Sequence, residues 1–187
     1  MPPRNSTRNV LFALAVAMLR PISAVAVIHG QDDRVDVYEA SEAQKALADS
    51  VASVWEAPML KYDPQSGAYN LLTESLAVKM SLCPGERFRE QPTGPDCTAT
   101  LVGEDLMLTA GHCVINEKEC AKSRFVFGFM IKDAGGSAPS SVATTEVYAC
   151  AKVVNRYVNR TDKSVLRADY ALVRLDRKVT GHRIVPI

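Results

Sequence analysis

The amino-acid sequence predicts an all-β fold, a small antiparallel barrel preceded by one N-terminal helix. Six short runs of strand character follow residue 75, and turn-forming residues separate them. The same region contains no second long run of helical periodicity, which argues against parallel strands joined by helices. The chain has 187 residues and is 47% hydrophobic, enough to form the core of one such domain.

Residues 1–26 resemble a secretory signal peptide. Arg4 and Arg8 precede a ten-residue apolar run, and small residues follow up to Ala26. The apolar run is too short to span a bilayer, so we expect cleavage after Ala26 and a secreted or periplasmic protein without a membrane segment. The alternative interpretation is an uncleaved membrane anchor or a buried helix.

Residues 27–74 form an N-terminal segment in which we expect an amphipathic helix over about residues 41–57. Ser41 and Gln44 have the spacing of a capping box at its start. Pro58 ends the pattern of apolar residues at helical spacing, which are Leu47, Val51, Val54 and Trp55. We expect this helix to pack on the domain.

Residues 75–187 are expected to form the barrel, after a loop over residues 61–70. In residues 125–131 a large side chain falls at every second position, which is typical of a strand with one strongly apolar face. Residues 135–141, rich in Gly and Ser, are expected to be a flexible loop. The six predicted strands are residues 76–82, 98–102, 106–110, 124–131, 146–154 and 169–175.

Charge and metal-ligand spacing exclude several function classes. The net charge is +1, with basic and acidic residues interspersed, so we expect no nucleic-acid partner. Zinc held by Cys97, Cys113, Cys120 and His112 is conceivable, but their spacing matches no usual finger or ribbon. We therefore expect neither a metal nor a cofactor.

Two residues in the β-rich region have the chemistry of an acid–base site. His112 follows the apolar run 106–111, so it is either a fixed base at a strand end or a structural histidine. Asp169 begins an apolar strand, where a carboxylate needs a hydrogen-bonded partner unless it only starts a turn. If the two pair, the carboxylate fixes the imidazole tautomer and leaves the other ring nitrogen to accept a proton.

The cysteines indicate disulfides, because disulfides persist in the oxidising compartments to which an export signal leads. Cys97 and Cys113 flank the strand pair before the histidine, with fifteen residues between them, so a bridge would hold the base rigidly. The odd count leaves one cysteine without an internal partner, a first indication of sequence outside this chain. The five are Cys83, Cys97, Cys113, Cys120 and Cys150.

The motifs around these residues resemble those of one family. Leu-Thr-Ala-Gly-His112-Cys113 resembles the Thr-Ala-(Ala/Gly)-His-Cys motif of trypsin-like serine peptidases, and Asp169-Tyr-Ala-Leu resembles their Asp-Ile-Ala-Leu motif. The spacing of Cys97 and Cys113 matches the disulfide that these enzymes place around the catalytic histidine. More loosely, residues 30–35 and 83–93 resemble the bacterial, secreted branch related to glutamyl endopeptidases.

The resemblance implies the first antiparallel β-barrel of the two-barrel trypsin-like fold, with the second barrel absent. It also implies a serine endopeptidase acting on polypeptides, with His112 as general base and Asp169 as its orienting carboxylate. The family's serine lies in a Gly-Asp/Asn-Ser-Gly-Gly motif of the second barrel, so we expect this chain to be inactive alone. Ser137 is not expected to replace it, because no glycine pair follows it and it precedes Asp169.

The three remaining cysteines allow a second bridge. Among the remaining cysteines we expect Cys120 to pair with Cys150, leaving Cys83 for the missing half. The competing interpretation is an exported, non-catalytic pseudopeptidase that acts as a binding module. Its main difficulty is the apolar face that a lone barrel would expose.

Overall fold

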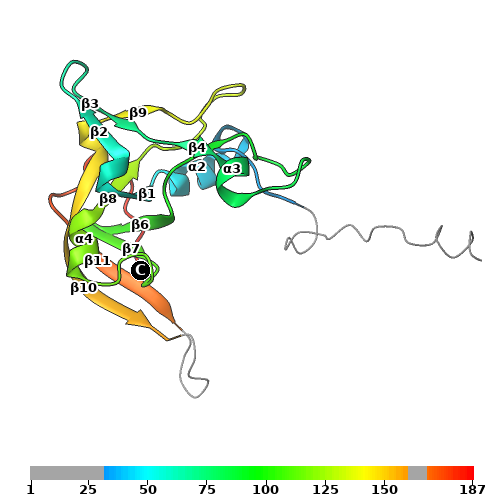
Figure 1. Cartoon of the computed structure of the whole chain (residues 1–187). Helices are drawn as coiled ribbons and strands as arrows, with labels where there is room; N and C mark the ends of the chain where they lie inside the picture. Colours follow the sequence, from blue (N-terminus) through cyan, green and yellow to red (C-terminus); the bar gives the residue numbers. More distant parts are fainter. Residues whose placement is uncertain (1–31, 160–167) are drawn as a thin grey trace, which may run out of the picture. The chain divides into compact units, whose positions relative to one another are not determined.

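The computed structural model describes residues 32–159 and 168–187, so the signal peptide expected over residues 1–26 lies outside the described residues. Val35–Ile187 form one compact unit. Its centre is a closed barrel of six strands, and the short helices and two small sheets lie outside that barrel (Figure 1). No helix in the described ranges has the length and apolar composition needed to cross a bilayer.

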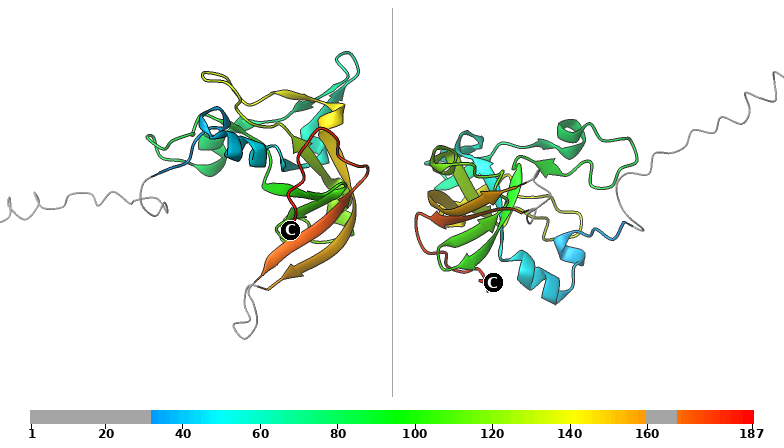
Figure 2. Two further views of the ribbon diagram at one scale, coloured as in Figure 1. Left: turned by 180° about the vertical axis from the view of Figure 1, so that it is seen from behind. Right: turned by 90° about the horizontal axis from the view of Figure 1, so that it is seen from below.

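Every neighbouring pair of strands in the barrel is antiparallel, in the order β1-β6-β7-β11-β10-β8. Both views of Figure 2 show β10 and β11 as long strands lying side by side. The predicted small antiparallel barrel is therefore confirmed. The strands are β1 (Val51–Glu56), β6 (Cys97–Gly103), β7 (Leu106–Thr109), β8 (Ser123–Phe127), β10 (Val147–Val158) and β11 (Asp169–Leu175).

Two small sheets and a few short helices occupy the connections between barrel strands. The sheets pair β2 (Leu60–Asp63), β3 (Ala68–Leu71) and β9 (Ser141–Ala143), and β4 (Glu74–Ser75) with β5 (Pro92–Thr93). The α-helices are α2 (Glu42–Ala48), α3 (Leu76–Met80) and α4 (Glu117–Lys122). Single 3-10 turns are η1 (Val37–Glu39), η2 (Ala57–Met59) and η3 (Thr144–Glu146).

Five of the six predicted strands correspond to barrel strands. Residues 169–175 match β11 from end to end, and residues 98–102 lie within β6. The strand predicted over 124–131 ends early, because Gly128 adopts a φ of 76° that an extended strand does not allow. The strand predicted over 146–154 continues to Val158 as β10.

The helix predicted over residues 41–57 is wrong beyond Ala48. Its start is as expected, since the Ser41 backbone N–H donates to Gln44 Oε1 over 2.9 Å in a capping box. Residues 51–56 instead form β1, in which Ala52 and Val54 face the barrel interior while Trp55 packs in a second cluster outside it. The barrel therefore begins inside the segment 27–74 rather than at residue 75.

The strand predicted over residues 76–82 is also wrong, because residues 76–80 form α3. The Ser75 hydroxyl caps the helix by accepting from the Val78 backbone N–H over 3.3 Å, and Ser81 ends it in the left-handed region. Val78 and Met80 are 70% and 60% exposed, so these two of the apolar residues that suggested a strand face solvent.

The loop predicted over residues 61–70 is instead the hairpin of β2 and β3. Its turn is held by Asp63, whose carboxylate accepts from the Ser66 hydroxyl over 2.7 Å and from the Gln65 N–H over 2.9 Å. These hydrogen bonds lower the pKa of the Asp63 carboxyl, and the bond from the Ser66 hydroxyl has the largest effect. Gly67 closes the turn at a φ of 67°, which other residues rarely adopt.

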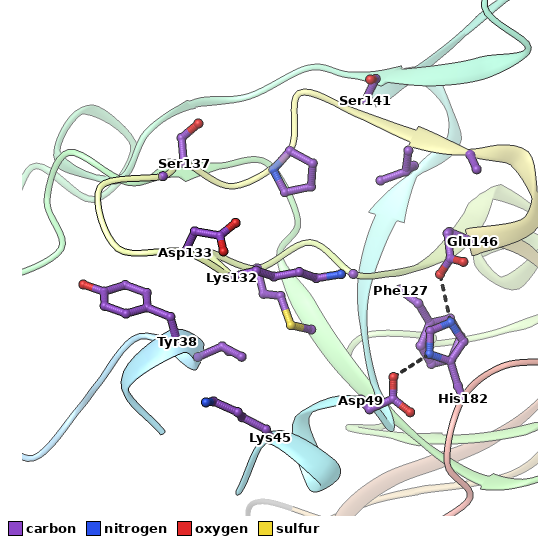
Figure 3. A pocket seen from close by; sticks show the side chains of 17 residues that line it. Tyr38, Lys45, Asp49, Phe127, Lys132, Asp133, Ser137, Ser141, Glu146 and His182 are labelled. Carbon is purple, nitrogen blue, oxygen red and sulfur yellow. Dashed lines mark hydrogen bonds and ion pairs between the residues drawn. The ribbon is translucent and has the colours of Figure 1, made fainter. Parts of the chain in front are cut away.

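His182 connects three segments of the chain at the edge of the barrel (Figure 3). Its imidazole stacks on Phe127 with the ring centroids 4.1 Å apart. Nδ1 lies 3.0 Å from Asp49 Oδ1, at the end of α2, and Nε2 lies 2.8 Å from Glu146 Oε2, in η3. The histidine side chain is only 12% exposed, so the imidazole is largely shielded from water, whereas the carboxylates of Asp49 and Glu146 are 44% and 34% exposed.

We expect His182→Ala to lower the free energy of unfolding by about 1–3 kcal/mol, because two carboxylates lose a shielded partner and Phe127 loses its stacked ring. Urea denaturation followed by fluorescence measures the change. Lys122→Ala is the control, since its exposed ion pair with Glu119 contributes little. An equal midpoint for the two variants would show that the histidine does not hold these segments together.

Candidate active site

His112 lies in a tight turn directly after β7. The Cys113 backbone N–H donates to the Ala110 carbonyl over 3.0 Å and closes the turn. From β10, Arg156 Nε donates to the Gly111 carbonyl over 2.6 Å and ties the turn to the barrel wall. The turn therefore holds the imidazole in a defined place while its side chain stays 53% exposed.

Asp169 is brought to this turn by strand register. β11 pairs with β7 so that Ala171 is opposite Thr109; Asp169 comes two residues before Ala171, and Gly111 comes two residues after Thr109. Because the pairing is antiparallel, the first residue of β11 meets the residues that follow the last residue of β7. The acidic residue and the histidine turn thus lie at the same end of two adjacent strands.

The Asp169 carboxylate contacts His112 twice. Oδ1 accepts from the His112 backbone N–H over 3.0 Å, and Oδ2 lies 2.8 Å from the imidazole Nδ1. The carboxylate is 23% exposed, so a position that would otherwise cost desolvation energy has hydrogen-bond donors. This contact favours the tautomer with its proton on Nδ1, which makes Nε2 the basic nitrogen.

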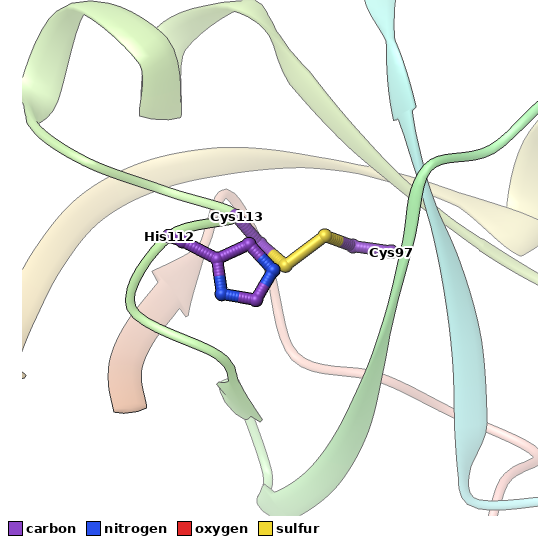
Figure 4. A group of neighbouring side chains, drawn as sticks. All are labelled: Cys97, His112 and Cys113. Atoms are coloured by element: carbon purple, nitrogen blue, oxygen red, sulfur yellow. A yellow bond between two sulfur atoms is a disulfide. The ribbon is translucent and has the colours of Figure 1, made fainter. Parts of the chain in front are cut away.

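A disulfide fixes the turn from its other side. Cys97, the first residue of β6, is bonded to Cys113, the residue directly after the histidine. Figure 4 shows the imidazole of His112 beside this bridge, and one ring nitrogen lies within 4.8 Å of both sulfur atoms. The base therefore lies between a carboxylate that orients its ring and a covalent link that restrains its backbone.

The second predicted bridge, between Cys120 and Cys150, is also present and joins α4 to β10. Cys120 is consequently not beside His112 as a thiolate, and the four-residue zinc set considered from the sequence is not assembled. Among the described cysteines, Cys83 alone is outside a disulfide, and it is exposed.

A cavity of about 340 Å³ opens beside His112, the bridge and α4. Ser123 is the serine among its lining residues, but this side chain is buried and its hydroxyl donates to the Glu119 carbonyl over 2.8 Å. Ser137 lies in the loop between β8 and β9 and lines a different cavity of about 720 Å³, beside His182 (Figure 3). Neither serine is placed as a nucleophile for His112.

Two supporting residues were not found by sequence reasoning. Arg156 contacts the histidine turn across 45 positions of sequence, a separation that no local pattern indicates. Gly111 has no space for a side chain, because a Cβ there would lie 2.5 Å from Val158 Cγ2 and 2.8 Å from the Tyr170 carbonyl oxygen. The glycine in the histidine motif is the one signal that pointed to this close approach.

Comparisons with known proteins agree with this geometry at the level of family. A family model described as Trypsin matches residues 87–187, more than half of the chain. No curated protein matches the sequence.

Two solved structures have low similarity to the chain. An inactivated protease paralogue of the scabies mite has 13% identity and a TM-score of 0.34, and a mutant of human heparin binding protein has 14% and 0.32. These matches cover 84% and 74% of the chain but 47% and 42% of the two structures, so the chain spans less than half of their length. At such TM-scores they add nothing to the assignment of fold or function.

We expect Gly111→Ala to displace the histidine turn, because its Cβ would meet backbone oxygens of two neighbouring strands. Such overpacking typically costs about 1–3 kcal/mol of stability. Denaturant unfolding measures that loss, and NMR of the His112 Nδ1 proton measures the weakened hydrogen bond to Asp169. Gly85→Ala is the matched control, since nothing lies within 4 Å of its Cβ position. A variant as stable as the control, with an unchanged Nδ1 resonance, would contradict the expectation.

Proposed function

Because this chain belongs to the trypsin family, we propose that it supplies the base and the orienting carboxylate of a serine endopeptidase. The observation that carries the proposal is the double contact of the Asp169 carboxylate with His112, at the backbone N–H and at Nδ1. This arrangement orients an imidazole that remains half exposed at the edge of a cavity. It is the arrangement that a base acting on a second reactant requires.

In the proposed reaction, Nε2 of His112 accepts the proton of a serine hydroxyl as its oxygen attacks the peptide carbonyl carbon. Asp169 stabilises the resulting imidazolium and keeps its proton on Nδ1. The imidazolium then protonates the leaving amine, which leaves an acyl-enzyme. His112 then accepts a proton from a water molecule as that water attacks the acyl carbon. This step releases the carboxylic acid product and regenerates the serine.

We propose that the serine and the oxyanion donors come from a second barrel outside these 187 residues. Support for this comes from Ser123, which is buried and hydrogen-bonded to the Glu119 carbonyl, and from Ser137, which lines another cavity. On this proposal the isolated chain has no peptidase activity, because a base without nucleophile and oxyanion donors does not hydrolyse peptides.

The substrate on this proposal is a polypeptide, and its side-chain preference depends on residues outside this chain. The motifs at residues 30–35 and 83–93 favour the bacterial, secreted branch related to glutamyl endopeptidases. Two disulfides are compatible with a secreted or periplasmic location.

The test is peptide hydrolysis by the protein encoded when the reading frame is continued past the Ile187 codon. We expect His112→Ala to lower kcat by about 10⁶-fold and Asp169→Asn by about 10⁴-fold, since the triad acts as a unit. His182→Ala is the matched histidine control, and we expect kcat per folded molecule to be unchanged. Hydrolysis that survives His112→Ala would contradict the proposal.

A fluorophosphonate probe, which acylates activated serines, provides the complementary measurement on the 187-residue chain. We expect no labelling of that chain, because Ser123 is buried and donates to the Glu119 carbonyl, and Ser137 lines a cavity other than the one beside His112. Labelling of the purified chain would refute an external nucleophile. A stop codon directly after Ile187, with soluble monodisperse protein, would instead favour the exported binding module.

N-terminal sequencing of exported material tests the location. We expect a start at Val27, because the small residues before it suit cleavage after Ala26. An intact Met1 start on exported protein would contradict the signal-peptide interpretation.

A further inference from the structure

Three side chains with affinity for soft metals meet at the histidine turn. One ring nitrogen of His112 and the sulfur atoms of Cys97 and Cys113 all lie within 4.8 Å of one another (Figure 4). Imidazole and thiolate are the ligands that Zn²⁺ prefers in proteins. In the oxidised chain the two sulfurs are bonded to each other and carry no thiolate charge. The three groups therefore form a ligand set that the disulfide blocks.

Reduction converts this bridge into two ligands. A water-soluble phosphine donates two electrons to the disulfide, and the S–S bond breaks. The phosphine takes the oxygen of a water molecule and becomes a phosphine oxide, and the two hydrogens of that water convert the two sulfurs into thiols. Binding of Zn²⁺ then releases the two thiol protons. In a tetrahedral site the sulfurs lie roughly 3.8 Å apart and each lies roughly 3.6 Å from the nitrogen, as Zn–S bonds of about 2.3 Å require. Two side chains no longer covalently joined reach these separations by small rotations.

The Asp169 carboxylate already contacts the ring nitrogen of His112 that would not bind zinc. Histidine ligands of zinc usually donate their other ring N–H to a carboxylate, which fixes the ring and makes it more basic. Here Asp169 Oδ2 lies 2.8 Å from Nδ1, which assigns Nε2 to the metal. The same hydrogen bond that prepares His112 to accept a proton also prepares it to bind zinc.

The site is accessible to both reductant and metal. The cavity of about 340 Å³ beside the turn is lined by Cys97, His112 and Cys113. Its ionisable lining also includes the carboxylates of Glu56, Asp96 and Glu119 and the ammonium of Lys122. Asp96 is paired with Lys79 over 2.7 Å and Glu119 with Lys122 over 3.1 Å, so these three carboxylates and two ammonium groups leave a net charge of −1, which favours a cation only weakly. Water from this cavity can fill the fourth position of the tetrahedron.

We propose that opening the Cys97–Cys113 disulfide creates a Zn²⁺ site formed by both thiolates and His112 Nε2, with Asp169 holding the histidine. Zinc binding itself does not depend on the peptidase function. The effect of zinc on catalysis rests on the proposed function, because zinc bound to Nε2 occupies the nitrogen that accepts the serine proton. The reduced and zinc-loaded protein therefore has no peptidase activity at this site.

The experiment measures zinc binding by the full 187-residue chain carrying Cys83→Ser, which removes the exposed thiol. After phosphine treatment, alkylation and mass spectrometry identify the open bridge, and circular dichroism follows the fold. Co²⁺ serves as the spectroscopic probe and Zn²⁺ as its competitor. We expect one metal per reduced chain, with the thiolate-to-cobalt absorption and visible bands of a tetrahedral site, and none in the oxidised chain.

Two variants assign the ligands independently of any peptidase assay. We expect His112→Ala and Asp169→Asn each to weaken Zn²⁺ binding by about 10- to 100-fold, whereas His182→Ala leaves it unchanged. Equal affinity in the His112→Ala variant would overturn the proposal, because the thiolates alone would then hold the metal. A reduced chain that unfolds, or stays folded and takes up no zinc, would overturn it as well. Failure of peptide hydrolysis leaves this result unaffected.

Discussion

The pairing of β11 with β7 is the constraint on which the rest of the site depends. Four registered pairs, from Ala171 with Thr109 to Arg174 with Leu106, place the first residue of one strand beside the turn that ends the other. A shift by one residue would turn the apolar side chains of β11 out of the barrel and Asp169 away from His112. Core packing and the carboxylate–imidazole contact thus enforce the same register.

Strands were predicted correctly from the sequence where the local pattern of apolar residues matches the strand face that is buried in the structure. Residues 169–175 were predicted as a strand with the bounds that β11 has, and in the structure Ala171, Val173 and Leu175 face the core while their neighbours do not. The prediction failed at β1, where Ala52 and Val54 lie inside the barrel and Trp55 is buried outside it, so apolar residues occupy both faces. A strand covered on both sides loses its period of two, and the remaining spacing resembled a helix.

The site itself was predictable in its chemistry but not in its supports. His112, Asp169 and the Cys97–Cys113 bridge were expected from short motifs and from a family resemblance, because such motifs carry their roles with them, whereas the Cys120–Cys150 bridge was chosen among the remaining cysteines. Arg156 and the tight packing at Gly111 arise from contacts between β10, β11 and the turn, which exist only once the barrel has closed. Residues that orient others through long-range contact leave no local pattern.

The placement of β1 has a consequence for the order in which the chain folds. Val51 pairs with Thr100 of β6, and Ala52 pairs with Phe127 of β8, so the first barrel strand to be synthesised must wait for partners far along the chain. Such non-local pairing slows folding, since the entropy of closing a long loop is lost before any contact is gained. Until β6 is made, β1 has no strand partner, and until β8 is made, its second edge stays unpaired. Because the closed barrel also requires β11, which ends at Leu175, the nascent chain cannot complete the barrel until nearly all of these 187 residues have been made.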